Sequence, residues 1–352
     1  MEIPHELTDI TAPWIDEALG VPGVTAIEVT DIGEGTGIFG QLARVSVTAD
    51  GDAPSSVVVK LACTEPANLA VAQALGLYQR EIAMFEHIVD DAPFRSPTCH
   101  LALQDPEGPF ALVMEDMSVD YEVGDQVVGA TLEQAETIVD AVAGLHAQWW
   151  ERPELEGFDW LPVPNAPTYL AAVPGIYRAG VPVFVAEWAD RVPAAATDLV
   201  LQVEPRFEEI LDATAGGPRT LIHGDTRLDN FFFPKDGSNE VAFIDFQLAL
   251  QGRGASDIAY LLMNSVPTEI AADQWENLLR RWLDRLGELG VSGYDLDDAI
   301  AHYRTAALYL LSGAMSLIGT FDSGNERGAA MTEAYTLRSL NHVVDIDAGA
   351  VL

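Results

Sequence analysis

The feature that most constrains this chain is a polar loop between two apolar, aromatic-rich segments within residues 221–247. Leu221 and Ile222 lead into the sequence HGDTRLDN at 223–230, and three phenylalanines follow it. The polar linker 234–239 has the composition of a hairpin turn, and a second apolar segment, VAFIDFQ, follows at 241–247. The pattern predicts two strands that deliver a few polar side chains to one end of the pair.

Three of these polar side chains form a set of oxygen ligands. Asp225 stands five residues before Asn230, and Asp245 follows on the second strand. One carboxylate can receive a hydroxyl proton, while an amide oxygen and a second carboxylate suit a hard cation such as Mg²⁺. We expect chemistry of the kind needed for phosphoryl transfer from ATP.

The same residues carry a family resemblance. HGD-x4-N followed by I-D-F resembles the kinase motif of the aminoglycoside phosphotransferase and choline kinase superfamily, which has a protein-kinase-like fold. HGDTRLDN resembles a bacterial branch of uncharacterised phosphotransferases, and the DFQ triplet at 245–247 resembles the ecdysteroid-kinase-like branch. The alternative is a loop that holds acidic residues by chance in a chain rich in them.

The composition and charge of the chain limit its size class and its partners. With 352 residues, 49% of them hydrophobic, the chain can bury the core of one large domain or of two lobes. A formal charge of −37 disfavours nucleic acid and anionic membranes as partners, and it would attract a cationic substrate or serve solubility. The start lacks a signal-peptide pattern, and we expect a cytoplasmic protein. Cys63 and Cys99 do not form a zinc pattern.

A glycine-rich segment near the N-terminus is followed by strands. G-x-G-x-x-G alone fits a dinucleotide-binding turn as well as a kinase glycine loop. A dinucleotide-binding turn opens a helix, whereas here 42–47 and 55–60 both have strand character and a turn at 50–52 joins them. The arrangement favours a glycine hairpin over ATP phosphates. The residues expected at the nucleotide are Gly35, Thr36, Gly37, Gly40 and the strand lysine Lys60.

A helix is predicted over residues 68–88. Glu81 lies on its apolar face, and an acidic residue there usually has a partner. The resemblance implies that Glu81 pairs with Lys60; a solvated helix face is the alternative. By the same resemblance, the buried strand 110–114 runs into a hinge at Glu115, Asp116 and Met117, where backbone groups would meet the adenine.

The remaining segments are mainly helical. A helix from Thr131 to Trp150 has a capping box, and His146 near its end is expected to be a packed structural residue. Residues 151–220 are proline- and aromatic-rich and then helical from about 181 to 212. Ser256 or Asp257 is expected to cap the next helix. The chain has no A-P-E sequence after Asp245, which argues against a protein kinase.

The resemblance implies an α+β, bilobal protein-kinase-like fold. Residues 1–117 would form a small antiparallel N-lobe with one main helix, and 118–352 a larger, mostly helical C-lobe. ATP and Mg²⁺ would be bound, with Asn230 and Asp245 holding the metal. Asp225 would act as the base, His223 would brace its loop, and Arg227 would contact phosphate or a loop carboxylate.

The expected activity is that of a kinase acting on a hydroxyl of a small molecule: a metabolite, sugar, steroid-like compound or antibiotic. The alternatives are an aminoglycoside O-phosphotransferase and a nucleotide-binding protein of kinase fold without turnover. A dinucleotide oxidoreductase is a weaker hypothesis. No nucleic acid, membrane or protein partner is expected.

Overall fold

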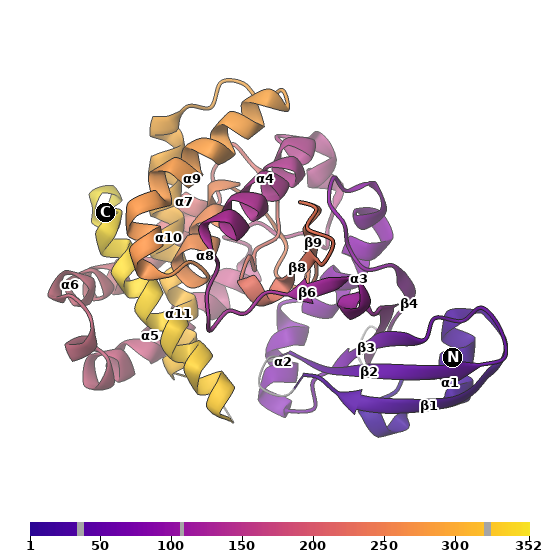
Figure 1. The fold of residues 1–352 in the computed structure, drawn as a ribbon. Helices are drawn as coiled ribbons and strands as arrows, with labels where there is room; N and C mark the ends of the chain where they lie inside the picture. Colours follow the sequence, from indigo (N-terminus) through magenta and orange to yellow (C-terminus); the bar gives the residue numbers. More distant parts are fainter. Residues whose placement is uncertain (34–38, 106–108, 320–324) are drawn as a thin grey trace. The chain divides into compact units, whose positions relative to one another are not determined.

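The computed structural model describes residues 1–33, 39–105, 109–319 and 325–352 (Figure 1). Contacts between residues divide the chain into two compact units. Unit 1 consists of Met1–Glu122 and Ala242–Gln247, and unit 2 consists of Val123–Val241 and Leu248–Leu352. The expected boundary after residue 117 falls inside the first of these segments. Residues 242–247 also belong to unit 1, which a division at one boundary did not predict.

Unit 1 is built on a five-stranded antiparallel sheet with the strand order β1-β2-β3-β5-β4. Its strands are β1 (Val24–Asp31), β2 (Gly40–Ala49), β3 (Ser56–Ala62), β4 (Cys99–Gln104) and β5 (Phe110–Glu115). Alternate residues Val57, Val59 and Leu61 of β3 enter an apolar cluster with Val45 and Ala111, which is the period expected of strands with one face in a core. The predicted antiparallel N-terminal sheet is confirmed.

Three α-helices accompany this sheet in the described part of unit 1. They are α1 (Ala12–Leu19), α2 (Pro66–Ala74) and α3 (Leu77–His87). The single helix expected over 68–88 is wrong, because Gly76 has a φ of 65° and interrupts it. Glycine adopts this left-handed conformation at little steric cost, so one helix can end and another begin in a new direction. The two-residue strand β9 (Ala242–Phe243) also belongs to unit 1.

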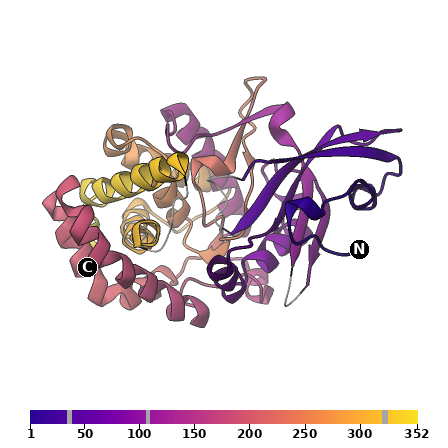
Figure 2. The ribbon, with the colours of Figure 1, turned by 90° about the horizontal axis from the view of Figure 1, so that it is seen from below.

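Unit 2 is mainly helical. Its α-helices are α4 (Leu132–Trp149), α5 (Pro167–Glu187), α6 (Ala194–Val203), α7 (Phe207–Thr214), α8 (Ala255–Asn264), α9 (Thr268–Glu288), α10 (Leu296–Gly319) and α11 (Glu326–Asp345), the last drawn in yellow in Figure 2. Its short strands are β7 (Thr220–Ile222), β8 (Phe231–Pro234) and β10 (Leu250–Gly252), and β6 (Tyr121–Val123) ends where the unit begins. Short 3-10 turns join several of these elements.

Two helix predictions have different outcomes. The helix expected from Thr131 is confirmed, since Thr131 and Gln134 form the capping box at the start of α4. The continuous helix expected over about 181–212 is wrong. Three helices occupy the region, and the first of them starts earlier, at Pro167, because proline suits the first turn of a helix.

Helix α5 forms part of the core of unit 2. It packs against α10, and a Cβ atom added to Gly180 would lie 2.3 Å from the Met315 carbonyl oxygen, so only glycine permits this approach. Among the described helices, α5 alone has the length and apolar composition that could cross a membrane. Tyr177 and Phe184 on α5 are fully buried, as expected of a helix in a protein core.

Candidate active site

Lys60 in unit 1 is a buried cation held by two carboxylates. Its Nζ atom lies 2.7 Å from Oε1 of Glu81 on α3 and 3.1 Å from Oδ1 of Asp245. Burial acts to lower the pKa of Lys60, but the charges of Asp245 and Glu81 outweigh burial and raise it above its ordinary value. The lysine is therefore charged at neutral pH. The pair that the resemblance implied is present.

Glu81 is almost completely buried. Burial raises its pKa to about 7, against the lowering effect of Lys60, and the nearby charge of Asp245 adds to the rise. Two acidic groups therefore compete for one ammonium group. A ligand that moves Asp245 or Lys60 will therefore change how charge is shared among Lys60, Glu81 and Asp245.

Asp245 has an unusual backbone conformation, which α3 supports. Its φ is 63°, in the left-handed region that a residue with a Cβ atom rarely adopts. Arg80, buried on α3 beside Glu81, donates from Nη1 to the Gln247 carbonyl oxygen at 2.7 Å. Phe85 of α3 contacts Phe246 edge to face, with ring centroids 5.7 Å apart. One helix thus holds both the partner of Lys60 and the segment that carries Asp245.

The glycine-rich loop is described only in part. Gly35, Thr36 and Gly37 lie outside the described residues. Gly40 begins β2, and a Cβ atom added there would lie 3.2 Å from the Leu61 carbonyl oxygen and 3.4 Å from Cε of Lys60. A side chain at position 40 would therefore crowd the Leu61 carbonyl oxygen and the side chain of Lys60.

Residues 115–117 are fixed by side-chain contacts. Glu115, at the end of β5, accepts a hydrogen bond at 2.6 Å from Nη2 of Arg95. Asp116 accepts from Nε of Arg44 and Oγ of Ser56, both at 2.8 Å. Partial burial acts to raise the pKa of Asp116, but these bonds and those from Ser118 hold it below its ordinary value. These bonds hold the side chains of Glu115 and Asp116 in place.

In unit 2, Asp225 lies in a loop that follows β7. Its side chain is 10% exposed, and its Oδ1 atom is buried without a hydrogen-bond donor among the described residues. A buried acceptor atom without a donor is costly unless a ligand or water serves it. Asn230 donates from Nδ2 to the Asp225 carbonyl oxygen at 2.9 Å. This bond orients the amide and leaves its oxygen as the atom that can bind a cation.

Arg227 lies beside the Asp225 carboxylate. Its Nε atom is 3.4 Å from Oδ2 of Asp225, and Nη1 is 3.9 Å from the sulfur of Met331 on α11. Of the two contacts expected for Arg227, phosphate or a loop carboxylate, the described residues contain the second. Burial raises the pKa of Tyr260 on α8, and the charge of nearby Asp225 adds to this.

Asp257, in the first turn of α8, holds the start of this loop. Either Ser256 or Asp257 was expected to cap the helix, but no side chain caps α8, that of Asp257 included. Its Oδ2 instead accepts the amide of His223 at 2.7 Å, and Oδ1 accepts the amide of Gly224 at 2.9 Å. The buried carboxylate thus binds two backbone donors that the loop would otherwise leave unsatisfied.

Two buried histidines belong to this arrangement. Nε2 of His146, on α4, lies 3.1 Å from Oδ2 of Asp257, and the Trp282 indole donates to its Nδ1 at 3.0 Å. His146 is therefore packed inside the unit. His223 accepts the amide of Asp225 on Nδ1 at 3.3 Å. Both side chains support the loop from within.

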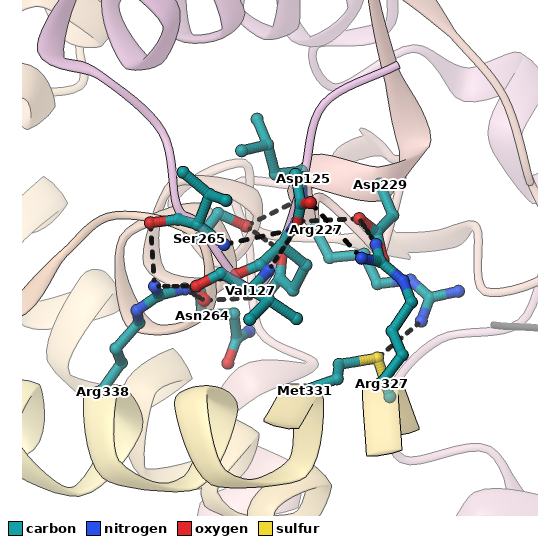
Figure 3. A network of polar contacts seen from close by, with 12 residues as sticks. Asp125, Val127, Arg227, Asp229, Asn264, Ser265, Arg327, Met331 and Arg338 are labelled. Carbon is teal, nitrogen blue, oxygen red and sulfur yellow. Dashed lines mark hydrogen bonds and ion pairs between the residues drawn. The ribbon is translucent and has the colours of Figure 1, made fainter. Parts of the chain in front are cut away.

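The far end of the loop is held by residues distant in sequence (Figure 3). The Gln126 side chain accepts the Leu228 amide at 2.8 Å, and the Gln126 backbone amide donates to Asp229 at 2.8 Å. Arg338 of α11 donates to the carbonyl oxygens of Gln126 and Val127 at 2.6 and 3.0 Å. Sequence reasoning missed Arg80, Gln126 and Arg338, because none lies in a motif; only their polarity within apolar surroundings could have marked them.

The candidate metal ligands fit Mg²⁺ by chemistry. Asn230 in unit 2 and Asp245 in unit 1 each offer an oxygen, the atom that Mg²⁺ prefers. Within the described ranges, no group of three or more His, Cys, Asp and Glu side chains could hold a metal ion. This is compatible with Mg²⁺ bound through one or two protein ligands together with substrate phosphates and water.

Solved structures share this fold. The GDP and kanamycin complex of APH(2")-IIia matches with a TM-score of 0.55 and 15% identity, covering 95% of this chain and 97% of that one. A microcompartment-associated aminopropanol kinase matches with a TM-score of 0.55 and 16% identity, covering 93% and 94%. An ethanolamine kinase from Plasmodium vivax matches with a TM-score of 0.51 and 13% identity, covering 88% and 82%. The predicted α+β, kinase-like fold is confirmed.

Sequence comparison assigns the family. No curated protein sequence matched the chain. Residues 43–295, more than half of it, match the family described as the phosphotransferase enzyme family, APH. The matched range includes Lys60, Glu81, the loop from His223 to Asn230, and Asp245. The chain therefore belongs to the phosphotransferase enzyme family.

Proposed function

We propose that the protein transfers the γ-phosphoryl group of ATP, with Mg²⁺, to a hydroxyl group of a small molecule. The observation that carries the proposal is the buried Lys60 ammonium between Glu81 and Asp245, with Nζ–O distances of 2.7 and 3.1 Å. Such a lysine is a point charge set to bind phosphate oxygens, and the carboxylate beside it is set to bind a cation.

The residues of unit 1 would hold the nucleotide. Lys60, presented by Glu81, contacts the phosphates, and the backbone of Gly35, Thr36, Gly37 and Gly40 covers them. The segment Glu115, Asp116 and Met117 meets the adenine. Asp245 and Asn230 supply oxygen ligands to Mg²⁺, which when bound neutralises phosphate charge as it develops. One structural neighbour is a GDP complex, so the nucleotide assay should include GTP.

The loop of unit 2 would act on the acceptor. Asp225 receives the proton of the acceptor hydroxyl and aligns its oxygen for attack on the γ-phosphorus. The oxygen–phosphorus bond to the acceptor forms as the bond to ADP breaks, so the products are a phosphate ester and ADP. His223 keeps the loop in place, and Arg227 acts beside the carboxylate. Positioning and charge neutralisation supply most of the rate in such a reaction.

Two alternatives remain distinct hypotheses. An aminoglycoside O-phosphotransferase is favoured by one observation, the kanamycin in the complex of a structural neighbour. A nucleotide-binding protein without turnover would lack the base, the metal ligands or the lysine, and this chain has all of them. We also propose that the protein is cytoplasmic and acts without a nucleic acid, membrane or protein partner.

An assay of product release and a measurement of nucleotide affinity test the proposal. Release of ADP or GDP is measured with Mg²⁺ and a panel of hydroxyl-bearing metabolites, sugars, steroids and antibiotics, including kanamycin. Asp245→Ala should abolish the Mg²⁺-dependent part of ATP affinity in titration calorimetry, because a phosphate-bound cation loses a protein ligand. Unchanged Mg·ATP affinity in this variant would remove Asp245 from the metal site. Nucleotide binding without product release under any condition would favour the binding protein.

A further inference from the structure

Residues 124–129 of unit 2 lie against the short 3-10 turn Leu228–Asn230, whose last residue is one of the two proposed ligands of Mg²⁺. The Gly124 amide donates to the carbonyl oxygen of Phe231, the residue directly after the turn, at 2.9 Å. A Cβ atom added to Gly124 would lie 2.5 Å from the Leu228 carbonyl oxygen, so only glycine permits this approach. Segment 124–129 is therefore in close contact with the backbone of the turn.

Gln126 makes most of the contacts between this segment and the turn. It is completely buried, and its Oε1 atom accepts the Leu228 amide and the Ser265 hydroxyl, both at 2.8 Å. Its Nε2 atom donates to the Asn264 carbonyl oxygen at 2.7 Å. A backbone amide can only donate and a carbonyl oxygen can only accept, so these partners fix the orientation of the side-chain amide. Gln126 thus satisfies the first amide of the turn, which the turn itself leaves without an acceptor.

The backbone of Gln126 joins the same turn to helix α11. Its amide donates to Oδ1 of Asp229 at 2.8 Å, and its carbonyl oxygen accepts from Nη1 of Arg338 at 2.6 Å. Arg327, near the start of α11, lies 3.3 Å from a carboxylate oxygen of Asp125 and 3.3 Å from one of Asp229 (Figure 3). Helix α11 therefore holds segment 124–129 against the turn.

The position of Asn230 depends on this turn. Asn230 is 2% exposed, and its one hydrogen bond from Nδ2, to the Asp225 carbonyl oxygen at 2.9 Å, orients its amide group. Mg²⁺ demands near-ideal octahedral geometry with oxygen atoms at about 2.1 Å, so a ligand that moves by a few tenths of an ångström binds it less well. Residues that orient a metal ligand without touching the metal typically change metal affinity by about 10- to 100-fold when they are replaced.

We propose that Gln126 is a positioning residue for Asn230: it fixes the turn Leu228–Asn230 and thereby sets how strongly the protein binds Mg²⁺. The inference rests on the proposed function, because it takes Asn230 as a ligand of the Mg²⁺ that accompanies ATP. Gln126 acts through Asn230 and does not bind the metal itself. A role in stability alone would require only that Gln126 be buried and hydrogen-bonded, and its effect would not depend on Asn230.

The quantity to measure is the factor by which Mg²⁺ increases ATP affinity, obtained for the full chain by titration calorimetry with and without Mg²⁺. Gln126→Met keeps a side chain of similar size and removes its hydrogen bonds. It should lower this factor by about tenfold, or abolish a factor that is smaller than that.

Gln251→Met is the matched control. Gln251 is also buried in unit 2, and its Nε2 atom donates to the carbonyl oxygens of Leu155 and Leu161 at 2.7 and 2.8 Å. Its replacement removes bonds of the same kind at a distance from the turn in sequence. This variant should be less stable than wild type, and the factor by which Mg²⁺ increases ATP affinity should stay unchanged.

A double-variant cycle separates positioning from general stability. Asn230→Ala removes the proposed ligand and should itself lower the Mg²⁺ factor. If Gln126 acts through Asn230, adding Gln126→Met to Asn230→Ala should lower the factor no further. Ser265→Ala is a milder variant, because it removes one donor to Gln126 and the second acceptor of the Leu228 amide, at 2.9 Å. It should lower the factor in the same direction and by less.

The outcomes distinguish failure of the inference from failure of the proposed function. A wild-type factor in Gln126→Met, together with a lowered factor in Asn230→Ala, overturns the inference and leaves the metal assignment in place. Independent effects in the cycle also overturn it. If Mg²⁺ does not change ATP affinity in the wild-type chain, or if Asn230→Ala keeps the full factor, the metal assignment fails and the inference falls with it. Should Gln126→Met not fold, Ser265→Ala takes its place in the cycle, and the same outcomes decide.

Discussion

The candidate residues of the two units are held in place in different ways. In unit 1 the charges hold one another: Lys60 lies between Glu81 and Asp245, at 2.7 and 3.1 Å. In unit 2, side chains hold the backbone. Asp257 accepts two loop amides, and Gln126 accepts a third. The first arrangement responds to any ligand that brings charge, whereas the second resists change, because each bond fixes a peptide group.

The difference fits the two tasks proposed. A phosphate site must exchange one set of charges for another when the nucleotide binds and leaves, so ion pairs that can be redistributed suit it. A base must stay within a few tenths of an ångström of its target, so a loop fixed at its peptide groups suits it. Substitutions in unit 1 should therefore change nucleotide affinity, and those in unit 2 should change turnover, Mg²⁺ binding or stability.

The largest effect is expected at the base. Asp225→Asn should lower kcat by about 10²- to 10⁴-fold, because the amide cannot accept the hydroxyl proton, while ATP affinity stays within a few-fold. Single-turnover kinetics and calorimetry measure the two quantities. Asp284→Asn, at an exposed position of α9, makes the same change in charge and should have no effect. Turnover near the wild-type rate in Asp225→Asn would remove this residue from the base role.

The next effect should appear in stability. Asp257→Ala should lower the free energy of unfolding by about 3–5 kcal/mol, because the amides of His223 and Gly224 would lose their acceptor and His146 would keep only Trp282 as a side-chain partner. Urea unfolding measures the change, and Asp284→Ala is the control of equal charge. A loss below about 1 kcal/mol would mean that the loop satisfies these amides in another way.

The same difference explains how well the sequence predicted each of the two regions. Lys60, Glu81 and Asp245 lie in segments with a recognisable pattern, so their residue types and order suggested the pair. Strand character likewise predicted β2, β3 and β5 of unit 1, whereas β4 was not predicted. The supports of the loop in unit 2 are bonds to peptide groups, which every residue has. Gln126 and Asp257 could therefore reach the loop from 102 and 34 positions away without any spacing rule.

The errors in the helices have a local origin. Apolar residues recur from 68 to 88 with no proline between them, so periodicity alone could not show that Gly76 turns the chain between α2 and α3. Asp257 was expected to cap α8 because aspartate near a helix start usually does. Three nearby donors compete for its carboxylate instead, and only the folded chain brings them there.

A smaller effect tests the charge pairing in unit 1. Lys60→Ala and Glu81→Ala should each lower kcat/KM for ATP by about 10- to 100-fold, and the double variant should be little worse than the stronger single one. Lys60→Arg should not restore the rate fully, because a planar guanidinium differs in shape from an ammonium group. Additive effects would show that Glu81 does not act through Lys60.

The smallest effect is expected in the dependence of stability on pH, where the two units should differ in sign. In unit 2, burial lowers the pKa of His342 to about 3 and that of His302 to about 4. The unfolded chain binds these protons near pH 6.5 and the folded chain does not, so stability is lost as pH falls below 6.5. In unit 1 the raised pKa of Glu81, about 7, acts in reverse, because the folded chain holds the extra proton.

Between pH 7 and pH 5, His342 should lower the free energy of unfolding by about 2 kcal/mol, since one pKa unit corresponds to about 1.4 kcal/mol. His302 is only partly buried, so solvent screening makes its contribution smaller.

His342→Gln removes the larger of the two contributions to the pH dependence. This variant should be less stable than wild type at pH 7, because Tyr303 loses its buried partner at 2.6 Å. Its free energy of unfolding should nevertheless fall by about 2 kcal/mol less than that of wild type between pH 7 and pH 5.

Glu81→Gln should lose more free energy of unfolding than wild type over the same pH range, because it lacks the group that gains a proton in the folded state. Urea unfolding at pH 7, 6 and 5 measures both slopes. An unchanged slope in His342→Gln would show that the imidazole titrates equally in the folded and unfolded chain, and a shallower slope in Glu81→Gln would reverse the sign assigned to unit 1.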